Sequence, residues 1–309
     1  MSQLQAPGAV VMIRPHHFCS NPETRDDNAF QTLARETADV TSAQALAEFD
    51  AAVAALRGAG VNVHVFDDIS TETPDSVFPN NWFSTHAGGH VAVYPMYAAN
   101  RRKERRWDVI ELLKRDYRVQ DVIDYSGLEQ DGLALEGTGA MVLDHIGRIA
   151  YTVKSNRADP VLLERFCTHF NFEPMVFEAR DAQGRDVYHT NVLMGIGTDY
   201  ALICLDMITD PTRRAEVAAR LEETGRRVID LTPEQIAGFA GNALELTGHS
   251  RLLALSSRAA EVLRADQIAI IERSATLLPL TIPTIETAGG SVRCMLAAIH
   301  LSPRERTQS

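Results

Sequence analysis

The sequence predicts an α/β fold in which five repeated units close into a propeller-like ring. Five polar residues recur at intervals of 52 to 55 residues, each in a loop that leads into an apolar segment: Asn81, Glu136, His189, Asn242 and Cys294. A near-constant period of this size is typical of repeated supersecondary units. Ring closure would protect sheet edges and bring the five loops to one centre. An open α/β sheet with accidental spacing is the alternative.

The composition fits a globular protein that acts on small molecules. The chain has 309 residues, 45% hydrophobic and 23% charged, and a net charge of −11. We expect a single α/β-propeller domain over residues 1–309. No long basic cluster indicates nucleic-acid binding, no apolar run reaches the length of a membrane span, and the first residues lack a signal pattern. Four scattered cysteines without a CxxC pair predict a reduced, cytoplasmic protein without structural zinc.

Each unit is expected to contain a strand, a second strand, a helix and a third strand. An Ala-rich helix over 41–56 ends before Gly58-Ala59-Gly60, and residues 61–66 alternate like a strand. Residues 102–115 form a charged amphipathic pattern typical of a helix. The other expected strands are 9–13, 82–85, 91–94, 140–143, 148–153, 192–196, 200–204, 243–246 and 251–255, and the other helices are 160–170, 211–224 and 257–266.

Cys294 is the candidate nucleophile. It follows Gly289 and Gly290, where the backbone can bend sharply, and it would lie at the mouth of a buried strand. That position suits a reactive thiolate, although a free cysteine is often only a small core residue. His189 is a base that could activate the thiol, and Glu136 could orient His189 or hold a polar carbon centre.

Amide side chains would complete this centre. Asn80, Asn81 and Asn242 can both donate and accept hydrogen bonds, and Asp75 adds a second carboxylate. Such groups around a nucleophile suit attack on a planar carbon that bears nitrogens, as in amide, ureido and guanidino groups. Each residue alone also has an ordinary structural explanation, such as a turn cap for an asparagine. Their common phase in the repeat favours a shared site.

Several loops carry residues, in order and spacing, that match known motifs. They are Pro74–Asn81 (PDSVFxED), Arg101–Glu104 (SRRxE), Leu135–Gly139 (EGGD), Ser155–Arg157 (SxRTN), His189–Asn191 (HxD or HxN) and Gly289–Met295 (GGGxxCM). With them, most of the chain resembles the guanidine-modifying superfamily of amidinotransferases and arginine deiminases. It looks closest to the arginine-deiminase-related branch called citrulline utilization hydrolase. The resemblance implies a five-bladed α/β propeller, the pentein fold, with no metal or organic cofactor.

The resemblance also implies roles for the site residues. Cys294 would attack the central carbon of the substrate, His189 would carry protons, and Glu136 would hold substrate nitrogens and assist His189. Arginine side chains would bind the substrate α-carboxylate, because a guanidinium matches a carboxylate bidentately. The expected substrate-binding residues are Asp75, Asn80, Asn81, Asn191, Asn242, Arg102, Arg157 and Arg14.

Departures from the motifs suggest the substrate. Asn80, Asn81 and Asn191 stand where arginine-using relatives carry acidic residues, and Gly139 replaces the Asp of EGGD. A charge pair at contact distance is worth about 4 kcal/mol at an effective dielectric constant of about 20, so a site without these acids should favour a neutral ureido group. We therefore expect hydrolysis of citrulline to ornithine, ammonia and carbon dioxide.

Two alternatives remain at this point. The first is an arginine deiminase or a dimethylarginine or methylarginine hydrolase, and the second is a non-catalytic propeller that binds an amino acid. The expected partner is a small-molecule substrate, with neither nucleic acid nor membrane, and a homo-oligomer is compatible with the sequence.

Overall fold

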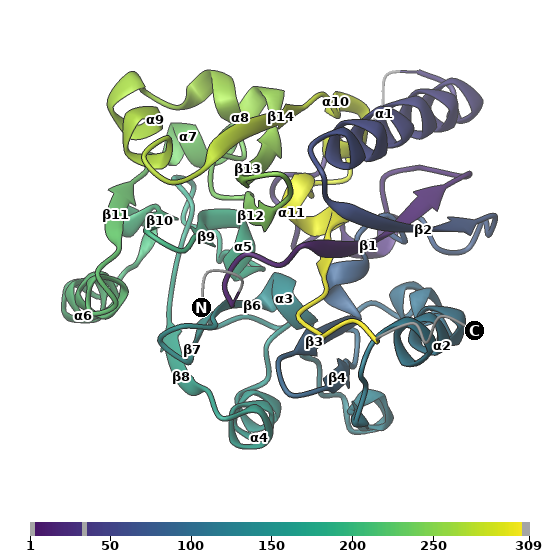
Figure 1. Cartoon of the computed structure of the whole chain (residues 1–309), viewed down its shortest axis with the longest axis horizontal. Helices are drawn as coiled ribbons and strands as arrows, with labels where there is room; N and C mark the ends of the chain where they lie inside the picture. Colours follow the sequence, from purple (N-terminus) through teal and green to yellow (C-terminus); the bar gives the residue numbers. More distant parts are fainter. Residues whose placement is uncertain (1–3, 33–35, 305–309) are drawn as a thin grey trace.

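Five three-stranded sheets surround a common centre in the computed structural model, which describes residues 4–32 and 36–304 (Figure 1). Within each sheet the middle strand pairs antiparallel with one neighbour and parallel with the other. The sheets are β3 (Phe83–His86), β4 (His90–Val93), β5 (Asp121–Asp124); β6 (Met141–Asp144), β7 (Ile149–Val153), β8 (Glu173–Phe177); β9 (Met194–Ile196), β10 (Tyr200–Ile203), β11 (Arg227–Asp230); β12 (Leu244–Thr247), β13 (Arg251–Ser256), β14 (Thr276–Leu280); and β15 (Ala297–Ala298), β1 (Ala9–Pro15), β2 (Asn62–Asp68). The predicted five-bladed α/β propeller is confirmed.

The fifth blade closes the ring because it combines both ends of the chain. The C-terminal strand β15 pairs antiparallel with β1, with Val10 opposite Ala298, and β1 pairs parallel with β2. Every strand in the described part of the chain is thus paired within one of five three-stranded sheets.

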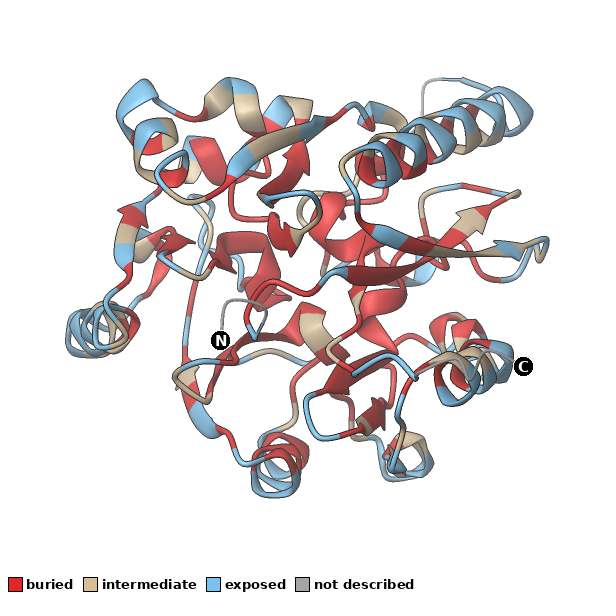
Figure 2. Cartoon of the chain, viewed as in Figure 1, coloured by how far each residue is buried: buried red, intermediate tan, exposed pale blue. Residues whose placement is uncertain are grey.

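Long helices connect the second and third strand of each blade and lie on the outside of the ring (Figure 1). Their inward faces are buried and their outward faces are exposed, as amphipathic surface helices require (Figure 2). They are α1 (Ala38–Gly58), α2 (Trp107–Asp116), α4 (Pro160–Phe170), α6 (Pro211–Glu222), α8 (Ser257–Val262) and α9 (Ala265–Ile271). No described helix is both long and apolar enough to cross a membrane.

Of the five predicted helices, only 160–170 has the expected bounds; 41–56 and 211–224 differ by two or three residues at an end, and two others differ more. The expected helix over 102–115 begins only at Trp107, and Asn100–Glu104 forms a separate 3-10 helix, η3. The expected helix over 257–266 is interrupted at Leu263 and Arg264, whose backbone is extended, so α8 and α9 are separate.

The feature that the sequence did not predict is a short helical turn before the first strand of most blades. These turns are η2 (Pro79–Asn81), α3 (Gly137–Ala140), α5 (Thr190–Leu193) and α11 (Val292–Met295), and α3, α5 and α11 gather at the ring centre (Figure 1). The other short helices are η1 (Pro22–Thr24), η4 (Ser126–Asp131), η5 (Leu205–Met207), α7 (Pro233–Ala237) and α10 (Pro283–Glu286). The turns place the polar residues of the 52-to-55-residue repeat around one axis.

Candidate active site

A small pocket of about 20 Å³ at the ring centre brings together side chains from distant loops. Cys294, His189, Asp75, Asn81 and Arg157, all predicted from the sequence, line it. Its other lining residues are Asn28, Phe78, Arg101, Tyr188, Ala288 and Gly290. One thiol and one imidazole therefore share a single small cavity, as the proposed chemistry requires.

Cys294 lies on the one-turn helix α11, before β15 rather than on a strand. Gly289 has a φ of +81°, so the backbone does bend sharply where the glycine pair predicted it. The Cys294 Sγ accepts hydrogen bonds from Asn191 Nδ2 at 3.2 Å and from Asn242 Nδ2 at 3.3 Å. Two amide donors aimed at the sulfur stabilise negative charge that develops there during reaction.

His189 is buried at the start of α5 and forms a hydrogen bond from its Nε2 to Glu136 Oε2 at 2.8 Å. Burial lowers the pKa of His189, and the hydrogen bond to Glu136 opposes this only in part, so the resting imidazole is neutral. With the Nε2 proton directed at Glu136, the Nδ1 atom keeps its lone pair and can accept a proton. This arrangement suits a general base that later becomes a general acid.

Glu136 is fully buried at the N-terminus of α3. Burial alone would raise the pKa of Glu136, but the charges of Arg157 and Arg101 and the hydrogen bond from His189 outweigh it and hold the pKa well below its usual value. The Arg157 Nη1 atom lies 3.3 Å and the Arg101 Nη1 atom 3.8 Å from Glu136 Oε2. Glu136 is therefore an ionised group that orients His189.

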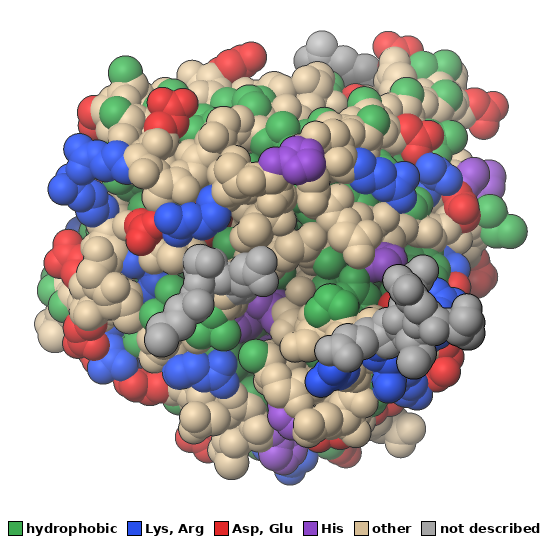
Figure 3. Space-filling model, viewed as in Figure 1, with side chains coloured by type: hydrophobic (Ala, Val, Ile, Leu, Met, Phe, Trp, Pro, Cys, Tyr) green, Lys and Arg blue, Asp and Glu red, His purple; other side chains and the backbone are tan. Residues whose placement is uncertain are grey.

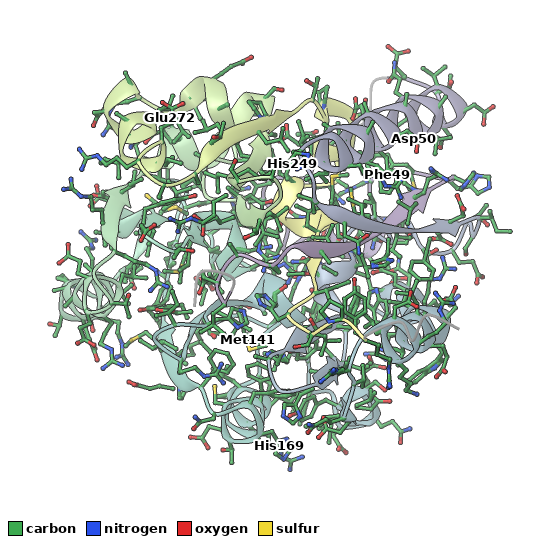
Figure 4. All side chains as sticks on the ribbon, in the orientation of Figure 1. Phe49, Asp50, Met141, His169, His249 and Glu272 are labelled. Carbon is green, nitrogen blue, oxygen red and sulfur yellow. The ribbon has the colours of Figure 1, made fainter. Side chains whose placement is uncertain are left out.

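Two of the three arginines predicted to bind substrate lie outside this pocket. The Arg102 side chain is 38% exposed and donates to the carbonyls of Met96 and Tyr97. Arg14 pairs with Asp50 and Asp67, and Asp50 lies on the peripheral helix α1 (Figure 4). Neither residue lines the pocket, so their contact with the substrate α-carboxylate stays a prediction.

Arg101 occupies the place that was expected for Arg102. It is buried and forms a bidentate pair with Glu104, with both N–O distances at 2.9 Å. Burial raises the pKa of Glu104 to about 8 in spite of this partner. Successive side chains of a 3-10 helix are about 120° apart, so η3 directs only one of two adjacent arginines inward. The sequence motif gave no signal of which one.

The segment over 21–31, which lies outside the motifs found in the sequence, also contributes. Arg157 Nε donates to Asp27 Oδ2 at 2.9 Å, and a second Arg157 nitrogen contacts the other oxygen of Asp27. Asn21 Nδ2 donates to Asp75 Oδ2 at 2.8 Å. The Asp27 pairing demonstrates that a carboxylate can reach Arg157 at the pocket.

The position of Gly139 explains one departure from the family motif. A Cβ atom at residue 139 would lie 2.1 Å from the terminal amide of Asn81 and 2.9 Å from His189 Nδ1. With its oxygen toward Arg101, the Asn81 amide accepts from Arg101 Nη1 at 2.9 Å and its nitrogen donates to Asn80 Oδ1 at 3.2 Å. Asn81 thus fills the space that a side chain at 139 would need.

The amide groups that were predicted to bind substrate have different positions. Asn191 and Asn242 contact the Cys294 sulfur, while Asn80 is fully buried beside Asn81 and does not line the pocket. Three buried polar atoms of this centre have no hydrogen-bond partner among the described residues: Asp75 Oδ1, Asn80 Nδ2 and Asn191 Oδ1. Buried polar atoms are normally satisfied, so unpaired ones mark where a ligand could bind.

More carboxyl groups surround the pocket than the sequence predicted. Two guanidinium groups, Arg101 and Arg157, meet four carboxyl groups, Asp27, Asp75, Glu104 and Glu136. Burial raises the pKa of Asp75, and the charge of Arg101 opposes this rise. Within the described residues, no three His, Cys, Asp or Glu side chains are arranged to hold a metal ion.

A family model described as "N,N dimethylarginine dimethylhydrolase, eukaryotic" matches residues 14–301, which is most of the chain. The chain belongs to this family. It is therefore a hydrolase that acts on non-peptide C–N bonds within the pentein superfamily. The narrower resemblance to the citrulline utilization branch is not supported by this match. No curated protein matches the sequence significantly.

Solved structures share the fold at low sequence identity. The N-terminal domain of ArgZ, an arginine dihydrolase from Cyanobacteria, superposes with a TM-score of 0.73 at 15% identity, covering 94% of this chain and 97% of that one. Unliganded AgrE gives a TM-score of 0.74 at 15% identity over 96% of this chain and 40% of that one. A dimethylarginine dimethylaminohydrolase adduct gives 0.65 at 12% identity, with coverages of 95% and 100%.

Proposed function

We propose that this protein hydrolyses a C–N bond at the guanidino carbon of arginine or of an N-methylated arginine, with Cys294 as the nucleophile. This assignment differs from the citrulline hydrolysis expected from the sequence. It is supported by the family match and by the structurally similar arginine dihydrolase and dimethylarginine dimethylaminohydrolase.

The observation that carries the proposal is the excess of carboxyl groups around the pocket. Four carboxyl groups face two guanidinium groups; burial raises the pKa of Glu104 to about 8 and also raises the pKa of Asp75, whereas the pKa of Glu136 is held well below its usual value. The remaining negative charge suits a substrate with a net positive charge. Arginine carries one, whereas citrulline is neutral overall, and each charge at contact distance is worth about 4 kcal/mol at an effective dielectric constant of about 20.

The α-amino-acid end of the substrate would fit the pair of Arg157 and Asp27 at the pocket. Arg157 would bind the α-carboxylate in the bidentate way that Asp27 now uses. Asp27 would then be free to attract the α-ammonium group. Asp75 Oδ1, which has no described partner, would accept a hydrogen bond from a guanidino nitrogen.

The reaction would proceed in two steps. His189 takes the thiol proton, and the Cys294 sulfur attacks the guanidino carbon to form a C–S bond. The terminal nitrogen then leaves as ammonia or a methylated amine, after His189 returns a proton to it. In the second step a water molecule gives a proton to His189 and attacks the same carbon, the C–S bond breaks, and His189 returns the proton to the sulfur, which releases the ureido product and restores the free thiol.

Citrulline is the second candidate substrate. Asn80, Asn81 and Asn191 are neutral where acidic residues would favour a guanidinium, and the Asn81 amide, which lines the pocket, would face a ureido group. Hydrolysis of citrulline would release ornithine, ammonia and carbon dioxide. The two candidates can be separated by their products.

The test is to incubate the protein separately with arginine, monomethylarginine, dimethylarginine and citrulline and to quantify all amine, ureido and amino-acid products. We expect citrulline and the corresponding amine from arginine or its methylated forms. Cys294→Ser should abolish turnover, whereas the exposed Cys19→Ser is the matched control and should not. Turnover of citrulline alone would reject the guanidino assignment, and no turnover of any of the four would reject both.

A further inference from the structure

A second cavity lies on the axis of the propeller and is separate from the pocket of Cys294. Residues from the inner strands of all five blades line it, and it shares no lining residue with the Cys294 pocket. It contains about 30 Å³ of free volume. This volume accommodates on the order of two water molecules.

The chemically unusual residue of this axial cavity is Arg293. Its side chain is 8% exposed, and its one hydrogen bond within the described residues runs from Nη1 to the Leu296 carbonyl at 3.2 Å. A guanidinium carries five N–H donors, so four are left for another partner. Buried charges are normally paired with an opposite charge because desolvation of an isolated ion is costly.

Carboxylates near this cavity are engaged elsewhere. Asp144, at the end of β6, forms a bidentate pair with Arg226 at 2.6 and 2.9 Å. Glu245 on β12 accepts hydrogen bonds from Thr198. Burial lowers the pKa of Arg293 to about 10, and the neighbouring Cys294 opposes this shift. Arg293 is therefore protonated at neutral pH and has no carboxylate partner among the described residues.

Other hydrogen-bond donors surround the same space. His145 and His300 line the cavity with their rings stacked at 3.9 Å between centroids. Burial lowers the pKa of both imidazoles, and the charge of Arg293 contributes to the lower pKa of His300, so each ring is neutral and carries one N–H. Histidine side chains are visible in the middle of this face of the molecule (Figure 3). Gln5 closes the wall by bonding the Leu143 and Ile196 carbonyls and the His145 amide.

We propose that the axial cavity binds one halide-sized anion, such as chloride, on the guanidinium of Arg293. The anion supplies the missing negative charge. The neutral imidazole of His145 offers a further N–H donor, whereas the His300 ring already bonds the backbone of Leu4. Because Arg293 precedes Cys294 directly in α11, the bound anion lies on the opposite side of the loop that carries the nucleophile. This site is independent of the substrate proposed above.

Bromide tests the proposal, because its anomalous scattering locates it in a crystal. Crystals of the full chain soaked in sodium bromide should show an anomalous peak in the axial cavity within about 3.5 Å of the Arg293 guanidinium, in the range of charge-assisted contacts. Bromide peaks on surface residues would serve as the internal control. Surface peaks without a peak in the cavity would overturn the proposal, and this result does not depend on any variant.

A solution measurement adds a second readout. The Tm should rise by roughly 2–4 °C in a saturable way with sodium bromide or chloride, relative to sodium gluconate at equal ionic strength, because gluconate is too large to enter. Arg293→Met should remove both the peak and the saturable rise. The matched control Arg227→Met changes an exposed arginine and should keep both. A cavity peak that persists in Arg293→Met would also overturn the assignment to this guanidinium.

Discussion

Replacement of Glu136 by Gln tests whether this buried carboxylate orients the base. The Glu136 Oε2 atom lies 2.8 Å from His189 Nε2 and 3.3 Å from Arg157 Nη1. At 3.3 Å a charge pair is worth about 5 kcal/mol at an effective dielectric constant of about 20, and loss of one partner of a buried pair typically destabilises a protein by about 3–5 kcal/mol. A positioned acid–base group contributes about 10²–10⁴-fold to a rate, so we expect kcat to decrease by about 10²–10⁴-fold.

The pH profile separates positioning from general destabilisation. Glu136 raises the pKa of His189 against the effect of burial, so the variant should lower that pKa further and shift the His189 limb of the kcat profile to more acidic pH. The assay is steady-state product formation between about pH 5 and 9 together with Tm. Glu245→Gln is the matched control, since Glu245 is equally buried but bonds Thr198 outside the pocket. A Glu136→Gln protein that keeps most of its kcat with an unchanged profile would refute the role.

Three further outcomes are expected. Gly139→Asp should abolish activity and cost about 1–3 kcal/mol of stability, because its Cβ would lie 2.1 Å from the Asn81 amide. The control Gly58→Ala, whose Cβ would have no atom within 4 Å, should change neither rate nor Tm appreciably. An active, stable Gly139→Asp protein would contradict the packing. Arg157→Lys should raise KM about 10–100-fold through loss of a bidentate contact, and Arg14→Lys should not, as substrate titrations would reveal. Burial lowers the pKa of His300 to about 4 from an ordinary 6.5, so its stabilising contribution is present above pH 6.5 and is lost as the pH falls toward 4. His300→Gln should therefore reduce the loss of unfolding free energy over this interval by up to about 3 kcal/mol. An unchanged slope of unfolding free energy against pH would contradict this.

The constant spacing of the repeat was the main basis for predicting the fold. Blade number and most strands follow from apolar segments at a constant spacing, because each unit buries its own strands against its neighbours. The short turns η2, α3, α5 and α11 were missed, since four residues are too few for a helical period to show. The break between α8 and α9 was missed as well, because no proline or glycine marks it.

The site was predictable where a residue's role depends on its phase in the repeat, as for Cys294, His189 and Glu136. It was not predictable where the role depends on which way a side chain turns. Arg101 and Arg102 are adjacent and chemically identical, and only the geometry of η3 directs Arg101 inward. Asp27 lies outside every motif and reaches Arg157 only through tertiary packing, so the acidity of the pocket was underestimated.

The most direct test of the account is acid-quenched mass spectrometry of the protein mixed with excess arginine or citrulline, followed by peptide mapping of all four cysteines. The account predicts a covalent substrate-derived adduct on Cys294 alone, formed fastest with arginine and absent from Cys294→Ser. Turnover by the Cys294→Ser protein would contradict it. So would an adduct on Cys19, Cys167 or Cys204 in place of one on Cys294.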